Sequence, residues 1–405
     1  MEQVKKCSLW VSSPACSLKR GSILLLSVMA ALFLADGNAA EPQPSTAVEE
    51  IMQKIDRHSF HPLHNGFTSD RTLKKHGIAN ISDLDWRVRT LAIRDLLRLG
   101  PESCAYVAKF LDHANLHVRH VSARVLGLWR QDRFVEPLKQ TLDRDGEPVV
   151  RAQAAFALGE IGSRTALALL HARGKSDPSR DVRHQCELAI HQVEHGIKPG
   201  QDLREGYLAL DEKKFKSVRV GKPAPEIPLR DTEGKLWKLS GFKGKKPVLL
   251  IWIFADWCPV CHGEFHELIE SKDDFQSAGI EVVTIECHDR YRCRVMVGKE
   301  AEPSYWFSKK SFKEEYTEKI WWPHLSDPGG LVGSIYGVDP LAFAVHSEFI
   351  NRPSTIIVDK NGIVRFAYYG TYWGDRPPIR KALEMIRDQQ FDYVNPKRLK
   401  PPVAR

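Results

Sequence analysis

Apolar positions between residues 83 and 195 recur at helical spacing and in a repeating unit. A Val-Arg pair marks each unit, and successive pairs are 30, 32 and 32 residues apart. The pairs are Val88-Arg89, Val118-Arg119, Val150-Arg151 and Val182-Arg183. A small residue follows each Val by four positions, and a large aliphatic residue follows it by eight. The pattern predicts an all-α solenoid of stacked helix pairs, each of which buries its apolar face against its neighbours.

Three of these valines are preceded, five residues earlier, by an aspartate: Asp83, Asp145 and Asp177. Aspartate is a favoured N-cap residue, so we expect these side chains to begin the helices. Cys186 occupies the small-residue position of its unit and is therefore expected to be a core residue.

A different pattern begins near residue 218. Residues 248–254 are a continuous apolar run with the length of a buried strand, and helical spacing follows it. Further strands are expected over residues 280–285, 355–358 and 363–368, with helices between them. This alternation predicts an α/β sandwich over residues 218–390, so the fold class is multi-domain, with a solenoid followed by a sandwich.

The remaining segments are assigned from composition. Residues 1–40 resemble a secretory signal peptide, with basic residues before an apolar core and small residues at Ala39 and Ala40. We therefore expect an exported protein, periplasmic or secreted, or one anchored in the membrane if this segment is not cleaved. Residues 41–82 are predicted to be a polar leader, 196–217 a charged linker and 391–405 a basic tail.

The chain has 405 residues, 42% of them hydrophobic, and a formal net charge of +8. That is enough apolar material for two globular domains. The basic residues form no long run and no stripe interleaved with aromatic residues, so no nucleic-acid partner is expected.

Cys258 and Cys261 form a C-x-x-C pair between the predicted strand and its helix. Amide groups at a helix N-terminus stabilise an anion, so we expect the pKa of Cys258 to be lowered. Cys258 would then attack a disulfide, and Cys261 would resolve the mixed disulfide.

Other interpretations of the cysteines remain open. Residues 258–262 also spell C-x-x-C-H, the attachment pattern of c-type haem, but a strand that leads into a helix favours a redox pair. Cys287 and Cys293 are spaced wrongly for a tight zinc site, and are expected to form a structural disulfide or a second redox pair. No cofactor and no metal ion are expected.

Three motifs carry a resemblance to a known family: VGKPAP at residues 220–225, FADWCPVC at 254–261 and PSTIIVDKNG at 353–362. Together they resemble the exported TlpA/ResA-type thiol-disulfide oxidoreductases, which have the thioredoxin fold. The resemblance implies that Cys258 is the nucleophile and Cys261 the resolving thiol. It also implies that Glu264 tunes the pair and that Pro353 aligns the substrate. The helical units resemble HEAT-like repeats.

Peroxiredoxins share the thioredoxin-like fold and are the alternative family. Their pattern P-x-x-x-T-x-x-C would place Cys261 at the peroxidatic position and Cys258 at the position of the threonine. The expected arginine is displaced, because Pro353 stands at its position and Arg352 one residue before it. The motifs therefore favour dithiol exchange over peroxidase activity.

The resulting prediction is an exported thiol-disulfide oxidoreductase that acts on protein thiols and disulfides. A protein partner is expected on the helical repeats. A thiol peroxidase is the enzymatic alternative. An adaptor, whose repeats bind a partner and whose redox domain is vestigial, is the non-enzymatic one.

Overall fold

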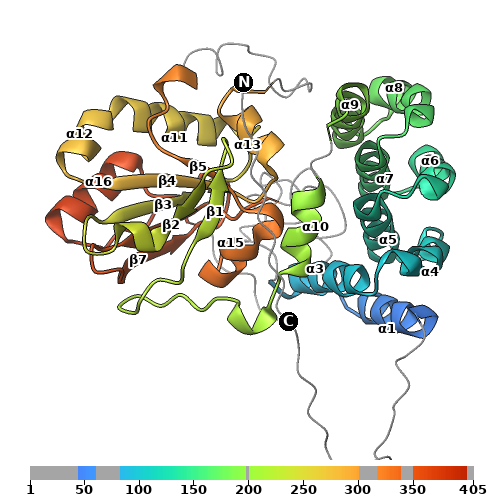
Figure 1. The fold of residues 1–405 in the computed structure, drawn as a ribbon, viewed down its shortest axis with the longest axis horizontal. Helices are drawn as coiled ribbons and strands as arrows, with labels where there is room; N and C mark the ends of the chain where they lie inside the picture. Colours follow the sequence, from blue (N-terminus) through green and yellow to red (C-terminus); the bar gives the residue numbers. More distant parts are fainter. Residues whose placement is uncertain (1–43, 61–82, 198–199, 301–316, 339–349, 399–405) are drawn as a thin grey trace, which may run out of the picture. The chain divides into compact units, whose positions relative to one another are not determined.

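The computed structural model describes residues 44–60, 83–197, 200–300, 317–338 and 350–398. The predicted signal peptide lies outside these ranges. Within them, no helix is both long enough and apolar enough to cross a membrane. A helical N-terminal part is followed by a part built on one mixed sheet, which confirms the predicted fold class (Figure 1).

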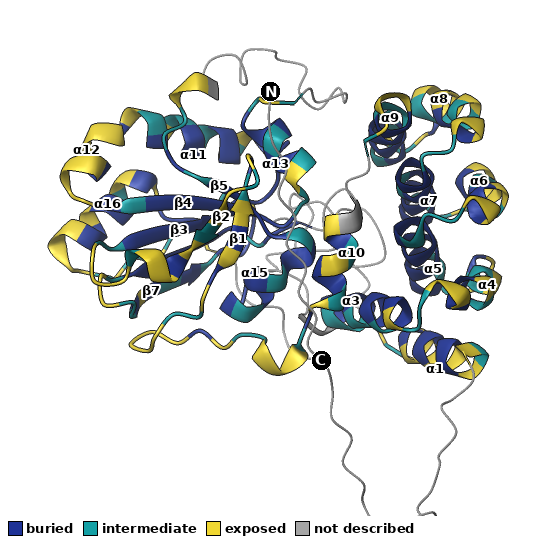
Figure 2. Cartoon of the chain, in the orientation of Figure 1, coloured by how far each residue is buried: buried dark blue, intermediate teal, exposed yellow. Residues whose placement is uncertain are grey.

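The helices of the repeat array alternate between two layers, α3, α5, α7 and α9 in one and α4, α6 and α8 in the other (Figure 1). Their bounds are α3 Asp83–Arg98, α4 Cys104–Val107, α5 Leu116–Trp129, α6 Val135–Arg144, α7 Pro148–Ile161, α8 Leu167–Ser176 and α9 Arg180–His195. The repeated small and aliphatic positions form one continuous core; Ala154, Leu158 and Cys186, for example, are fully buried. The predicted periodicity thus corresponds to the buried face of the array (Figure 2).

The repeated arginines have a structural role that links successive units. Arg119 donates from Nε and Nη2 to Asp145, at 2.7 and 3.0 Å. Arg151 donates in the same way to Asp177, at 2.8 and 2.9 Å. Asp145 and Asp177 were expected to be N-caps, but the caps are Glu147 and Ser179. The prediction is wrong because each aspartate instead accepts the arginine of the preceding unit.

Two segments outside the repeats also pack onto this core. Residues 44–56 form helix α1 (Pro44–Asp56), which buries Val48, Met52 and Ile55. The predicted polar leader is therefore wrong here, because apolar residues three and four positions apart give this stretch a buried face.

The predicted linker contains helix α10 (Gly200–Leu208), which buries Leu203 and Tyr207 in the same core. At Gly206, a Cβ atom would lie 1.9 Å from the carbonyl oxygen of Pro328, in the 3₁₀ turn Pro328–Gly330 of the sheet domain. Only glycine permits α10 to come this close to the turn of the sheet domain. Helix α10 is therefore packed between the repeat array and the sheet domain and is not a loose linker.

The second domain contains a seven-stranded sheet in the order β2-β1-β5-β4-β3-β6-β7. Strands β3, β4 and β5 are parallel, and the remaining neighbours are antiparallel. The strands are β1 Pro228–Asp231, β2 Leu236–Lys238, β3 Val248–Trp252, β4 Glu281–Glu286, β5 His324–Ser326, β6 Ser354–Val358 and β7 Val364–Tyr369. The helices are α11 Pro259–Glu270, α12 Lys272–Ser277, α13 Arg290–Met296, α15 Leu331–Tyr336 and α16 Ile379–Asp388.

Alternate residues of the central strands enter two different cores. Leu249 and Ile251 of β3 pack in a cluster with residues of α11, α12 and α16. Leu250 and Trp252 pack on the opposite face, with residues of α15. Strand β3 is buried along its whole length, as a central strand covered on both faces must be (Figure 2).

The start of the predicted basic tail also contacts this domain. Tyr393 lies against Tyr368, and the Arg398 guanidinium lies 4.8 Å from the centre of the same ring. The tail prediction is therefore wrong for residues 391–398, because their aromatic and basic side chains find partners on β7.

Candidate functional site

The two cysteines of the C-x-x-C pair lie where the chain passes from β3 into α11. Cys258 is the N-cap of α11, and Cys261 lies in its first turn. Both are free thiols, hydrogen-bonded to each other. Cys258 is 2% exposed and Cys261 is fully buried. The strand and the helix start therefore bring the two sulfur atoms together, as the spacing predicts.

Three donors converge on the Cys261 sulfur. The Phe254 backbone N–H donates to Sγ at 3.2 Å. Arg376 places Nη1 and Nη2 each 3.7 Å from the same atom. A guanidinium ion and a backbone N–H in a buried site stabilise a thiolate strongly, because little water screens them.

The thiolate therefore belongs to Cys261. Burial alone raises the pKa of Cys261, but the hydrogen bond with Cys258, the charge of Arg376 and the nearby backbone N–H groups lower it to about 6. Burial, the hydrogen bond with Cys261 and the negative charge of Cys261 raise the pKa of Cys258 well above its usual value. The expected low pKa at Cys258 is wrong, because the amide and guanidinium donors point at the other sulfur.

Glu264 is part of the same group. It is buried one helical turn after Cys261, and its carboxyl group contacts the Arg376 guanidinium. Burial raises the pKa of Glu264 to about 8, although the Arg376 charge opposes the shift. Below that pH the carboxyl group holds a proton and is neutral. The positive charge of Arg376 therefore mainly stabilises the Cys261 thiolate.

Arg376 is a functional residue that the sequence interpretation did not single out. It lies in the loop between β7 and α16, where Asp375 is fully buried and accepts hydrogen bonds from Thr371 N and Oγ1 at 2.7 and 2.6 Å. At Gly370 a Cβ atom would lie 2.3 Å from the Asp375 carbonyl oxygen. The signal in the sequence is weak: an Asp-Arg pair after a strand, with no motif around it.

Pro353 is buried directly before β6, and its carbonyl oxygen accepts a hydrogen bond from Gly370 N at 2.8 Å. Ser354, the next residue, pairs with Trp252 at the end of β3. Pro353 thus joins the end of the central strand to the loop that carries Arg376. Its predicted role in aligning substrate stays a prediction.

Cys287 and Cys293 are both free thiols, so the expected structural disulfide is not formed. A second redox pair stays a prediction. Cys287 packs against Trp86 of the repeat array. Cys293 lies in α13, where its sulfur is 3.8 Å from the Leu325 carbonyl oxygen. Glu286 and Cys287 are adjacent at the end of a strand and so point to opposite faces of the sheet. Cys293 groups with Glu286, which explains why the two cysteines are not paired.

A buried polar network holds the turn before Cys258. Asp256 N donates to Glu286 Oε1 at 2.9 Å, and the Asp256 carboxylate accepts two hydrogen bonds from Arg292, at 2.7 and 2.5 Å. The His262 Nε2 atom lies 2.7 Å from the Asp256 carbonyl oxygen. His262, the last residue of the C-x-x-C-H string, therefore stabilises the turn before Cys258 from inside the protein.

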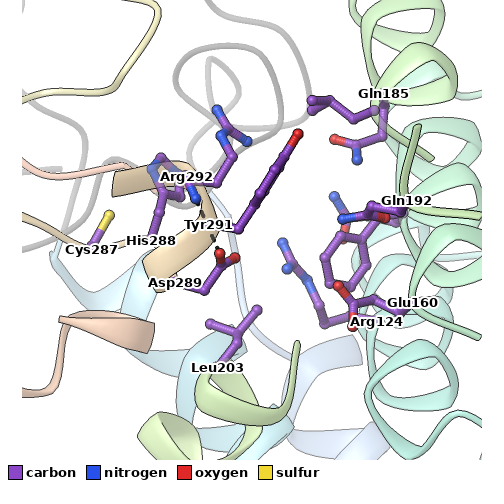
Figure 3. A pocket seen from close by; sticks show the side chains of 13 residues that line it. Arg124, Glu160, Gln185, Gln192, Leu203, Cys287, His288, Asp289, Tyr291 and Arg292 are labelled. Atoms are coloured by element: carbon purple, nitrogen blue, oxygen red, sulfur yellow. Dashed lines mark hydrogen bonds between the residues drawn. The ribbon is translucent and has the colours of Figure 1, made fainter. Parts of the chain in front are cut away.

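A pocket lies between the repeat helices and the start of α13 (Figure 3). Arg124 and Gln192 line it from α5 and α9, and His288, Tyr291 and Arg292 line it from the sheet domain. Tyr291 extends toward the repeat helices in this view (Figure 3). Polar side chains line the pocket on both sides, together with the apolar Phe156, Leu188 and Leu203. The protein partner expected on the repeats stays a prediction.

Comparison with known protein families gives two matches along the chain. Residues 220–367 match the AhpC/TSA family. Residues 78–155 and 106–191 match HEAT repeats. These ranges agree with the two parts that the sequence pattern separates.

Relatives of the second domain include both kinds of thiol enzyme. Chloroplastic peroxiredoxin Q of Sedum lineare is 32% identical over 202 residues, which cover 48% of this chain and 92% of that protein. The thiol-disulfide oxidoreductase ResA of Bacillus cereus is 28% identical over 165 residues, 41% of this chain and 76% of that protein. Among solved structures, peroxidoxin BcpB from Mycobacterium tuberculosis matches with a TM-score of 0.33 at 20% identity, over 42% of this chain and 97% of that one.

Proposed function

The chain belongs to the AhpC/TSA family, and from this premise we propose that it is a thiol oxidoreductase that cycles Cys258 and Cys261 between dithiol and disulfide. The observation that carries the proposal is the Cys261 sulfur, buried beside Cys258 and faced by Arg376 and the Phe254 N–H. In this proposal Cys261 is the attacking thiolate. Cys258 keeps its proton and then forms the disulfide with the oxidised Cys261.

The oxidant that this geometry fits best is a hydroperoxide. Cys261 is fully buried, and a small hydroperoxide needs far less room to approach a buried sulfur than a protein disulfide does. Arg376 supplies the positive charge that the peroxide oxygens require, although it comes from a different loop than the arginine position expected from the peroxiredoxin pattern. Cys258 takes the place of the threonine in that pattern and hydrogen-bonds to the reacting sulfur.

The reaction has two steps. The Cys261 thiolate attacks one peroxide oxygen, the O–O bond breaks, and the leaving alkoxide takes a proton, which gives an alcohol and a sulfenic acid at Cys261. The Cys258 thiol then condenses with that sulfenic acid, which forms the Cys258–Cys261 disulfide and releases water. An external dithiol returns the pair to its reduced state by exchange.

The test separates the two steps. After one equivalent of hydrogen peroxide, the protein is expected to contain a Cys258–Cys261 disulfide, and Cys258→Ser to accumulate a sulfenic acid at Cys261, trapped with dimedone and located by mass spectrometry. A sulfenic acid located at Cys258 in a Cys261→Ser chain, with none at Cys261 in Cys258→Ser, would overturn the assignment.

Exchange with protein disulfides is the second candidate. It is favoured by Cys258, which is the more exposed sulfur and caps the helix, as in the ResA-type pattern. Insulin reduction in the presence of a dithiol, measured beside peroxide consumption with the same protein, distinguishes the two substrates. Export through residues 1–40 is part of the proposal and is tested by the N-terminal sequence of the mature protein.

A further inference from the structure

A second cluster of reactive side chains lies beyond the C-x-x-C pair, at the carboxyl ends of the parallel strands. Glu286 ends β4, His324 begins β5, and Cys293 lies in α13. Glu286 and His324 share one face of the sheet because Thr284 pairs with His324 and Glu286 with Ser326. One ligand atom from each of Glu286, Cys293 and His324 lies within 4.8 Å of the others. Asp256, Glu286 and His288 satisfy the same condition.

The cluster is buried. Glu286 and Cys293 are fully buried, and His324 is 2% exposed. A carboxylate, a thiol and an imidazole are costly to remove from water unless their charges are balanced. A divalent cation with one carboxylate, one thiolate and one neutral imidazole has no net charge. The composition of the cluster therefore matches what a buried zinc ion needs.

Hydrogen bonds around the cluster already orient its members. His324 Nδ1 lies 2.9 Å from Thr284 Oγ1, which also accepts from Trp322 Nε1 at 3.0 Å. This arrangement turns His324 Nε2 toward Glu286 Oε2, at 3.2 Å. Metal-binding histidines are commonly held in this way through their other ring nitrogen.

The sulfur of Cys293 lies 3.8 and 3.9 Å from the carbonyl oxygens of Leu325 and His288, and its side chain also hydrogen-bonds with Ser326. On the other side of the carboxylate, His288 Nδ1 lies 2.7 Å from Glu286 Oε1. Ligand atoms of a tetrahedral zinc ion lie about 2.0–2.3 Å from the metal and hence about 3.5 Å from each other. The ligand atoms of Glu286, Cys293 and His324 lie within 4.8 Å of one another, so small side-chain movements would bring these three to such positions.

We propose that Glu286, Cys293 and His324 bind one zinc ion that ties β4, β5 and α13 together, while His288 stays hydrogen-bonded to the ligating carboxylate. Binding releases the Cys293 proton to solvent, and the Cys293 sulfur becomes a thiolate ligand. A solvent molecule takes the fourth position, and the ion takes no part in electron transfer because zinc has no redox chemistry. His288 also lines the pocket beside the repeat helices, which gives the cation a route to the cluster (Figure 3).

The site adjoins the active-site turn, because the Glu286 carboxylate accepts a hydrogen bond from the N–H of Asp256, four residues after the end of β3. The inference does not depend on the redox chemistry proposed above, and its test removes that chemistry. In a full-length chain with Cys258→Ser and Cys261→Ser, the dithiol cannot chelate a metal ion. This chain is the background for every measurement that follows.

The background chain, reduced and incubated with zinc chloride, is expected to retain one zinc per chain after gel filtration. Cobalt(II) in place of zinc is expected to give the thiolate-to-metal charge-transfer band in the near ultraviolet. Adding Cys293→Ser should abolish the band and weaken zinc binding at least about tenfold. Adding Cys186→Ser, at a buried cysteine of the repeat array, should change neither.

Two results would overturn the proposal. One is a background chain, folded by circular dichroism, that retains no zinc and gives no cobalt band. The other is an unchanged cobalt band in the Cys293→Ser chain. If Cys293→Ser fails to fold, His324→Gln serves as the second variant, and the spectrum of the background chain alone still decides between a metal site and a metal-free polar network.

Discussion

Two buried cysteines, one in each part of the molecule, have opposite acid–base behaviour. Cys186 of the repeat array and Cys261 of the sheet domain are both fully buried. Burial raises the pKa of Cys186 far above its usual value, whereas the pKa of Cys261 is lowered to about 6. Burial therefore makes a thiol inert by default, and only donors aimed at the sulfur make it reactive.

The two parts also use their arginines differently. In the repeat array, Arg151 forms an ion pair with Asp177 of the next unit, so its charge stabilises the contact between units. In the sheet domain, Arg376 reaches Cys261 from 115 residues further along the chain. Its charge is shared between Glu264, which is protonated below about pH 8, and the thiolate. The same residue type thus holds helices together in one part and tunes a sulfur atom in the other.

The strongest way to break the comparison is to exchange each cysteine for serine. Cys261→Ser should abolish turnover with either substrate, because it removes the thiolate that attacks. Cys186→Ser should leave turnover unchanged, because burial raises the pKa of its thiol and keeps it protonated. The measurement is peroxide consumption with an excess of dithiol. The rate enhancement should depend wholly on the nucleophile. Activity of Cys261→Ser above about 1% of the unmodified protein's would therefore contradict the assignment.

Removal of the guanidinium should have the next largest effect. Arg376→Met should raise the pKa of Cys261 by at least one unit and slow its alkylation by iodoacetamide at least about fivefold near pH 6. Glu264 stays protonated in this variant, so no buried charge is left unpaired. Arg380→Met, at an exposed position of α16, is the matched control and should have no effect. Equal rates in the two variants would show that Arg376 does not tune the sulfur.

The pH dependence sharpens the comparison further. Peroxide reactivity should rise as the pH increases through about 6, because Cys261 ionises there. It should fall a few-fold above about 8, because Glu264 then loses its proton and competes with the thiolate for Arg376. Glu264→Gln should keep the rise and lose the fall. A fall that persists in Glu264→Gln would assign it to another group.

The smallest effect on chemistry is expected from the repeat array. Arg151→Ala leaves the Asp177 carboxylate buried without its partner and should lower the free energy of unfolding by about 3–5 kcal/mol. Arg144→Ala removes a side chain that is 80% exposed and should change stability by less than about 0.5 kcal/mol. Thermal or urea unfolding compares the two. The pKa of Cys261 should be the same in both, since neither residue faces it.

The sequence predicts local and repeated features of this protein well. The Val-Arg period locates the helices of the array, and the apolar run before Cys258 locates the central strand, because both signals lie within a few residues. Helices α1 and α10 were missed because short amphipathic stretches among polar residues become ordered only by packing on a distant core. The position of the thiolate was missed for a similar reason: the local helix start favours Cys258, and the distant Arg376 favours Cys261.

The most direct test of the central claim is a titration of the reduced protein followed by ultraviolet thiolate absorbance. The account predicts a transition with a midpoint near pH 6 that is present in Cys258→Ser and absent in Cys261→Ser. A transition only near the ordinary thiol value of about 8.5, or one that disappears in Cys258→Ser and remains in Cys261→Ser, would contradict it.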